Sequence, residues 1–188
     1  MTRINLGSGW HYKPGWINVD LYAEQADLRA DLRTVDFDPA SVLLVEATHC
    51  IEHLTRTDTV MLLSRVFAWL RPGGRFIVEM PELSRCLRKA TFANMKGLMG
   101  GRSNDKLNWN QWIEENRENI YAEAMAGRQT CGIVPDEYQL PGEAHLYVWD
   151  EAEFKEAMEQ AGFYVTVEKP MNHGKREKRD CRWVGGKP

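Results

Sequence analysis

Residues 49–53 read HCIEH, and two histidines with a glutamate at this spacing are residue types that bind zinc. On one helix, two imidazoles four residues apart share a face, and H-x-x-E-H is typical of one class of zinc metallopeptidases. The pattern has this meaning only inside a helix, with a third ligand supplied from elsewhere. What the pentapeptide does therefore depends on the elements that position it.

The residues around HCIEH predict a strand end and a turn. An apolar run at 42–47, VLLVEA, has the length and branched residues of a buried parallel strand. A helix with one apolar face is predicted over about 57–70. His49 is therefore expected at a strand end, with Glu52 and His53 in the turn that leads into the helix. We expect no metal here, and a zinc hydrolase is kept as a remote alternative.

The first strand, RINLG, ends in the turn GSG at 7–9. Glycines at such a point let the backbone approach a ligand closely, although an ordinary tight turn has the same letters. Tyr12 stands where the dinucleotide fingerprint G-x-G-x-x-G needs its third glycine. A short link leads to a second strand, INVDL at 17–21, and is too short for the usual crossover helix. Asp20 at its end is either a turn residue or an acceptor for a ribose diol.

A third extended piece, ADLRADL, brings Asp31 to a strand end. This Asp is either an ordinary solvated carboxylate or an acceptor for an adenine amine, with Leu32 beside the ring. Further along, FIVEM at 76–80 reads as a strand after the turn RPGG. A helix capped by Asp150 precedes two strands at 163–170 and 179–188. Strands alternating with helices predict an α/β sheet with an antiparallel edge, and ligands of such sheets bind beyond the carboxyl ends of the strands.

The composition narrows the function classes. The 188 residues, 43% of them hydrophobic, predict one domain over 1–188. A formal net charge of -3 gives no global basic field, so we expect no nucleic-acid partner. No apolar run is long enough to span a bilayer, which predicts no membrane association. Four scattered cysteines and the absence of a signal pattern favour a cytoplasmic location.

Five segments in this order resemble the class I S-adenosylmethionine-dependent methyltransferases, most closely a short bacterial and phage, type 11-like branch. They are INLGSGWHYKPGWINVDL, ADLRADL, HCIEHL, LRPGGRFIVEMPEL and HLYVWDEAEFKEAMEQAGF. The resemblance covers about 1–83 well and 143–170 more loosely. It implies a Rossmann-like three-layer sandwich with about seven strands, a mostly parallel sheet and an antiparallel C-terminal strand. The first crossover helix is missing, so an insert or a second subunit, as in a homodimer, is expected to cover one sheet face.

The same resemblance implies S-adenosyl-L-methionine as cofactor and S-adenosyl-L-homocysteine as product. In that family the glycine turn faces the methionine part, the acid after the second strand holds the ribose, and the segments after the third and fourth strands line the adenine pocket. Carried over residue by residue, the predicted cofactor-binding positions are Leu6, Gly7, Ser8, Gly9, Asp20, Leu21, Asp31, Leu32, His49 and Ile51.

The segment at about 84–148 is predicted to be a helical insert that forms a lid, with one helix over roughly 105–126. His145 and Tyr121 are the candidates for acceptor contact or for a general base, which a hydroxyl acceptor needs and an amine does not. We expect a small-molecule or glycan acceptor, which the sequence does not identify. The alternative from another class is a non-catalytic module that binds S-adenosylmethionine or S-adenosylhomocysteine.

Overall fold

The computed structural model describes residues 1–86, 145–171 and 179–188. Its strands are β1 Thr2–Leu6, β2 Ile17–Asp20, β3 Leu28–Arg29, β4 Val42–Thr48, β5 Leu70–Pro81, β6 Tyr164–Glu168 and β7 Asp180–Gly186. Its helices are a 3-10 turn, η1 (Ile51–His53), and the α-helices α1 (Arg56–Trp69) and α5 (Glu151–Gln160). Most of the predicted insert, with its helix at 105–126 and Tyr121, lies outside the described residues, so its role as a lid stays a prediction.

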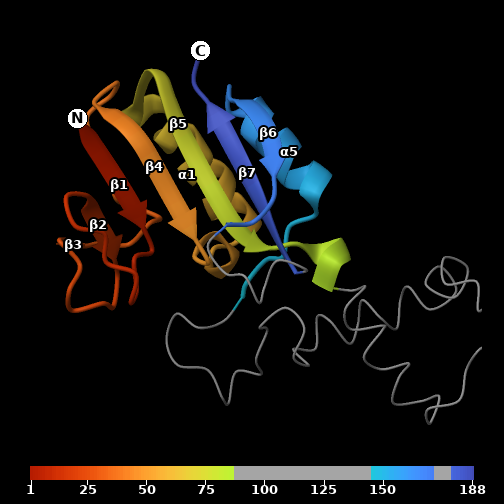
Figure 1. Cartoon of the computed structure of the whole chain (residues 1–188), viewed down its shortest axis with the longest axis horizontal. Coiled ribbons are helices and arrows are strands. Elements are labelled where there is room, and N and C mark those ends of the chain that lie inside the picture. Colours follow the sequence, from red (N-terminus) through yellow and green to blue (C-terminus); the bar gives the residue numbers. More distant parts are fainter. Residues whose placement is uncertain (87–144, 172–178) are drawn as a thin grey trace, which may run out of the picture.

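The seven strands form one sheet in the order β3, β2, β1, β4, β5, β7, β6 (Figure 1). Every neighbouring pair from β3 to β5 is parallel, whereas β7 is antiparallel to both β5 and β6. This confirms the predicted Rossmann-like α/β fold with an antiparallel C-terminal strand. The carboxyl ends of β1, β2, β4 and β5 therefore meet at one edge, which the start of β7 joins.

The link between β1 and β2, residues 7–16, contains no helix, as predicted. Two buried amide side chains hold it in place. The Asn5 amide donates to Asn18 Oδ1 at 2.9 Å and to the His11 carbonyl at 2.9 Å. Asn18 in turn donates to the Lys13 carbonyl at 3.0 Å and accepts from the Lys13 N–H at 2.8 Å. Side-chain amides thus satisfy backbone groups that a helix would satisfy internally.

The segment RPGG at 71–74 differs from its prediction as a turn outside the strands. It belongs to β5, which begins at Leu70 directly after α1. Gly73 has φ 75°, and the pairing of β4 with β5 shifts register between Val42 and Leu44. An irregular first part of β5 therefore absorbs the turn, and the strand starts earlier than the apolar run FIVEM indicates.

Helices α1 and α5 pack side by side on one face of the sheet (Figure 1). The Asp150 carboxylate caps α5 by accepting from the Ala152 N–H at 2.9 Å, as predicted. Glu153 does not close a capping box, because its carboxylate instead accepts from Arg56 and from Tyr147. The core between helices and sheet includes Ile4, Leu6, Val45, Ala47, Leu62, Leu63, Val66, Phe154, Met158 and Trp183, all buried.

Among the described residues, no helix covers the opposite face of the sheet (Figure 1). Along each strand, alternate side chains point to this face. Here they include Glu46, which forms an ion pair with Lys13, and the buried Glu79, which is 3.3 Å from Arg182. Such a polar face has less apolar area to bury than the helix-covered face. Whether the insert or a second subunit also covers it stays a prediction.

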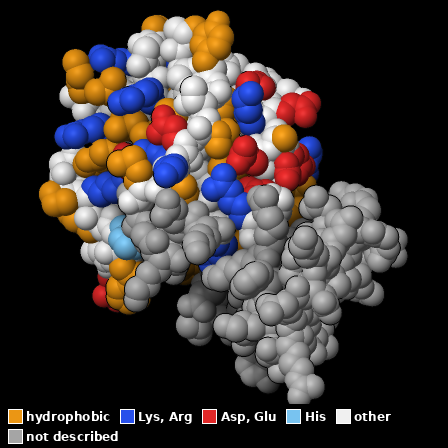
Figure 2. Space-filling model, turned by 45° about the vertical axis from the view of Figure 1, so that its right-hand side comes forward, with side chains coloured by type: hydrophobic (Ala, Val, Ile, Leu, Met, Phe, Trp, Pro, Cys, Tyr) orange, Lys and Arg blue, Asp and Glu red, His pale blue; other side chains and the backbone are white. Residues whose placement is uncertain are grey.

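The drawn surface carries charges of both signs. Figure 2 shows Lys and Arg side chains interspersed with hydrophobic ones, with Asp and Glu gathered towards one side. On that face the basic side chains form no continuous field of the kind that nucleic-acid binding uses. In the part of the chain that the structure describes, no helix is long and apolar enough to cross a membrane.

Candidate functional site

The carboxyl edge of the sheet has two neighbouring parts that differ in chemistry. We call the residues of the turn 6–9 together with Asp20 the glycine half. The histidine half consists of residues 49–53 after β4, residues 145–147, and residues 179–180 at the start of β7. Both halves lie at the edge where ligands of open α/β sheets bind.

The glycine turn packs directly against the turn that follows β4. Gly7 has φ 61°, and a Cβ atom placed on it would lie 2.2 Å from the Cβ of Cys50. The Cys50 thiol donates to the Leu6 carbonyl at 3.3 Å. Gly9 has φ 45°, and a Cβ atom there would meet nothing within 4 Å. Gly7 is thus required by packing, whereas Gly9 faces open space.

The Asp20 carboxylate joins the glycine turn to the residues that follow β2. Its Oδ2 accepts from the Gly9 N–H at 2.8 Å, and its Oδ1 accepts from the N–H groups of Tyr22 and Ala23, also at 2.8 Å. Each carboxylate oxygen has two lone pairs, so Oδ2 can still accept from a ligand hydroxyl. In the same turn, the hydroxyl of Ser8 is buried and has no hydrogen-bond partner in the described part of the chain. The predicted Gly7, Ser8, Gly9 and Asp20 are therefore brought together.

The predicted adenine-side residues follow β2 and β3. Leu21 is partly exposed, and Leu32 is half-buried against the core. The carboxylate of Asp31 accepts from the Arg33 guanidinium, with 2.9 Å between Nε and Oδ2. This hydrogen bond lowers the pKa of Asp31 against the opposing effect of partial burial. The Ala30 N–H donates to the Asp20 carbonyl at 3.2 Å, so this segment is joined to the glycine half.

His49 lies at the end of β4, as predicted, and its imidazole contacts Asp180 at the start of β7. Its Nε2 is 2.8 Å from Asp180 Oδ2, and its Nδ1 is 3.1 Å from Glu52 Oε1. Burial opposes the charge on His49, but the hydrogen bonds to Asp180 and Glu52 outweigh it and raise its pKa to about 9. His49 is thus a protonated bridge between two carboxylates. Ile51 is fully buried in the core and reaches the edge only through its backbone.

His145 lies beside Glu52 and His53. The Leu146 N–H donates to the Glu52 carbonyl at 2.8 Å, which fixes this segment against η1. His145 Nε2 is 3.9 Å from Glu52 Oε1, and the rings of His145 and His53 meet edge to face at 4.8 Å. Burial lowers the pKa of His145 to about 4, although Glu52 opposes that shift. The imidazole is therefore neutral at physiological pH.

The helical arrangement that a zinc peptidase requires is not formed by HCIEH. Only Ile51–His53 are helical, as one 3-10 turn, and His49 lies outside it in the left-handed region with φ 52°. His49 faces Asp180, whereas His53 faces His145. The two histidines of the pattern therefore have different neighbours.

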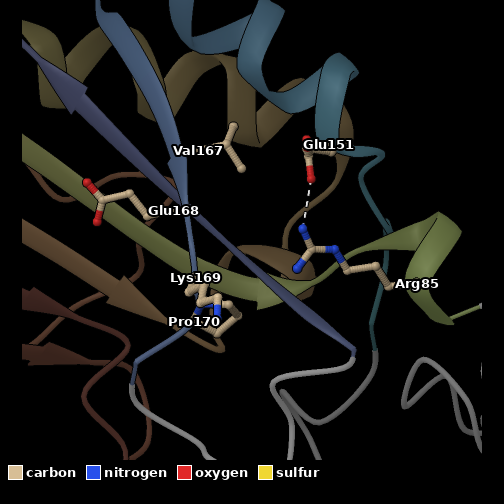
Figure 3. Close-up of a pocket in the computed structure, with 6 residues that line it drawn as sticks. All are labelled: Arg85, Glu151, Val167, Glu168, Lys169 and Pro170. Carbon is tan, nitrogen blue, oxygen red and sulfur yellow. Dashed lines mark hydrogen bonds and ion pairs between the residues drawn. The ribbon is translucent and has the colours of Figure 1, made fainter.

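A separate hollow of about 450 Å³ lies between the end of β5, the start of α5 and the end of β6 (Figure 3). Arg85 and Glu151 form an ion pair across it at 2.8 Å, and Lys169 lies at its other side. No residue predicted for the site lines this hollow. Arg85 also donates to the Asp180 carbonyl, so the hollow adjoins the histidine half.

Three features that shape this edge of the sheet were not among the predicted site residues. They are the pair Asn5 and Asn18, the buried carboxylate of Glu52, and Asp180. Asn residues inside two adjacent strands are a signal that could have been noticed, since Asn is depleted in strands. The meeting of Asp180 with His49 has no comparable signal, because the two residues are 131 positions apart along the chain.

Comparison with known proteins supports the resemblance seen in the motifs. A family of methyltransferase domains matches residues 11–168. No curated protein sequence matches the chain. A Mesorhizobium loti S-adenosylmethionine-dependent methyltransferase is 14% identical with a TM-score of 0.56, over 99% of this chain and 90% of that one.

Two further solved structures are similar. One is the Burkholderia thailandensis 1,6-didemethyltoxoflavin-N1-methyltransferase, solved with bound 1,6-didemethyltoxoflavin and S-adenosylhomocysteine. It is 14% identical with a TM-score of 0.56, and the match covers 99% of this chain and 70% of that one. Haemonchus contortus phosphoethanolamine N-methyltransferase 2, in complex with S-adenosyl-L-methionine, is 12% identical, with a TM-score of 0.55 over 100% of this chain and 49% of that one. At these identities the likeness shows the fold.

Proposed function

The chain belongs to the family of methyltransferase domains, and from this premise we propose that it transfers a methyl group from S-adenosylmethionine to a small-molecule or glycan acceptor. The observation that carries the proposal is the glycine half. There the Gly9 N–H donates to the Asp20 carboxylate at the carboxyl edge of the sheet, and the hydroxyl of the adjacent Ser8 is buried without a partner among the described residues.

The residues of the glycine half fit the cofactor. The buried Ser8 hydroxyl has no hydrogen-bond partner among the residues that the structure describes, and such groups in native structures usually bond to something. The open space beside Gly9 admits a ligand close to the backbone, where any other residue would place a side chain. Asp20 has acceptor capacity for the ribose hydroxyls, and Asp31 and Leu32 are the residues we propose on the adenine side.

The cofactor supplies a methyl group on a positively charged sulfur. The chain's contribution to direct displacement is alignment, which can account for a large share of a rate enhancement. For an amine acceptor no base is needed. For a hydroxyl acceptor, His145 is neutral at physiological pH and can accept a proton, and Tyr121 is the second candidate. We also propose a cytoplasmic location.

Calorimetric titration of the full chain with S-adenosylhomocysteine tests the cofactor site. We expect binding, and we expect Asp20→Ala to weaken it by about 10- to 100-fold, as for the loss of hydrogen bonds to a charged group. Glu156→Ala is the control, because it removes an exposed carboxylate on α5 that bonds to Gln160 and not to the edge. Absence of binding in the unaltered chain, or equal effects of the two variants, would contradict the proposal.

A labelled-methyl assay separates an enzyme from a binding module. The chain is incubated with methyl-labelled S-adenosylmethionine and fractionated extracts, and incorporation into each fraction is measured. We expect label in a small-molecule or glycan fraction, lost in Asp20→Ala. Cofactor binding without label in any fraction would favour the non-catalytic module.

A further inference from the structure

Three side chains of metal-ligand type converge in the histidine half: Glu52, His53 and His145. One ligand atom from each lies within 4.8 Å of the other two. The backbone holds them there, since the N–H groups of Leu146 and Tyr147 both donate to the Glu52 carbonyl. The cluster therefore depends on how the 145–147 segment docks against η1, and not on the H-x-x-E-H spacing.

Two buried polar atoms of the cluster have no hydrogen-bond partner among the described residues. One is Oε2 of Glu52, a residue that is only 1% exposed. The other is His145 Nδ1. Oε1 of the Glu52 carboxylate is 3.1 Å from His49 Nδ1, so the oxygen without a partner is Oε2. A buried carboxylate with an unsatisfied oxygen is costly unless something compensates its charge.

We propose that Glu52, His53 and His145 bind a divalent transition-metal ion, with Zn²⁺ the first candidate. Two imidazoles and a carboxylate form a ligand set typical of catalytic zinc sites, in which the fourth position is left to water or substrate. Ligands about 2.1 Å from a tetrahedral ion lie roughly 3.4 Å apart. Binding an ion would require the three ligand atoms to move closer than their present separations of up to 4.8 Å.

The surroundings include groups that favour and groups that oppose a cation. His49 donates to Glu52 and is itself held by Asp180, and hydrogen bonds of this kind orient metal-binding carboxylates. The positive charges of Arg179 and of the protonated His49 both oppose a cation. The Arg179 guanidinium is partly neutralised by Asp180, to which it donates at 2.8 Å.

The proposed metal site adjoins the glycine half, because Cys50, which precedes the proposed ligand Glu52 in the same turn, packs against Gly7. With His145 bound to it, an ion there would itself favour the deprotonation of an acceptor oxygen at its open position, in place of that imidazole as base. The proposal of metal binding rests on the three side chains alone and does not require methyl transfer. It reverses the expectation from the sequence that the chain binds no metal.

Calorimetry with ZnCl₂ on the full chain, freed of metal by chelation, tests the proposal. We expect about one Zn²⁺ per chain, with affinity reduced at least tenfold in Glu52→Gln, His53→Ala and His145→Ala. His11→Ala is the control, because His11 lies on the 7–16 link outside the cluster, and it should leave the affinity unchanged. No Zn²⁺ binding, or the same loss in His11→Ala, overturns the proposal.

A second measurement covers a variant that fails to fold. Co²⁺ bound by imidazole and carboxylate has visible d–d absorption without the strong thiolate band that cysteine ligands give, and His145→Gln should remove it while the circular dichroism spectrum stays unchanged. Retention of the absorption in His145→Gln overturns the proposal. S-adenosylhomocysteine binding by the metal-free chain is measured in parallel, so that failure of the metal site and failure of the proposed function are distinguishable.

Discussion

The glycine half and the histidine half lie side by side but are built in different ways. In the glycine half, the main contacts join backbone N–H groups to one carboxylate, that of Asp20. In the histidine half, buried charged side chains contact one another, as in the bridge of His49 between Glu52 and Asp180. Backbone contacts fix a shape, whereas buried charges must each be compensated.

The origin of the two halves along the chain also differs. The glycine half comes from residues 6–20, which run from the last residue of β1 through a short link to the end of β2. The histidine half brings together residues 49–53, 145–147 and 179–180. We therefore expect changes in the glycine half to act through backbone geometry, and changes in the histidine half to act through charge.

The largest effect is expected where the halves touch. Gly7→Ala would bring a Cβ atom into the Cβ of Cys50 and would require a left-handed backbone. We expect a loss of about 3 kcal/mol in unfolding free energy, measured by urea denaturation. Gly9→Ala and Gly15→Ala share the positive φ without the overlap, so each should lose about 1 kcal/mol. Equal losses in all three variants would show that the two halves are not in tight contact.

The next effect concerns the link that replaces a helix. Asn18→Ala removes the amide that bonds to Lys13 N and O, to Asn5 and to Asp27. We expect a loss of about 2–3 kcal/mol in unfolding free energy, since buried backbone groups are left unpaired. A loss below about 1 kcal/mol would mean that the link holds its shape without this amide.

Asp180→Asn tests the histidine half alone. Asp180 is fully buried and contacts both His49 and Arg179, so its neutralisation leaves two cations with less compensation. We expect a loss of about 2 kcal/mol, measured by urea denaturation, and S-adenosylhomocysteine binding within about twofold of the unaltered chain. Combined with Asn18→Ala, the losses should add to within about 0.5 kcal/mol, and a larger deviation would show that the halves are coupled.

The smallest effect is expected on the adenine side. Arg33→Ala removes the guanidinium that lowers the pKa of Asp31, so that pKa should rise towards its ordinary value in an NMR titration. The sign follows from linkage: a lowered pKa stabilises the folded chain above the ordinary value, and this contribution is lost as pH falls through the folded pKa. An unchanged pKa of Asp31 would mean that the contact with Arg33 is not formed in solution.

The sequence predicted the glycine half well because its signals are local. Strand patterns, a glycine turn and a strand-end Asp lie within about twenty residues, and the short link ruled out a crossover helix in advance. Strand boundaries were less accurate at β5, where the register shift absorbs RPGG into the strand.

The histidine half could not be predicted in the same way. The sequence placed His49 at a strand end, but only the antiparallel return of β7 brings Asp180 to its imidazole. His145 was singled out as an acceptor-side residue, yet its neighbour Glu52 belongs to a distant segment. Partnerships of this kind depend on topology, and nothing in the local pattern of HCIEH indicates them.

The short link between β1 and β2 has a consequence for the order of folding. Ile4 pairs with Ile17 and Val19 with Leu28, so β1, β2 and β3 associate by closing small loops. The entropic cost of closing a loop rises with loop length, so contacts between distant segments form more slowly. In contrast, β7 reaches β5 only after a long intervening segment. We expect the glycine half to form early and the histidine half to be completed last, when the chain's final strand enters the sheet.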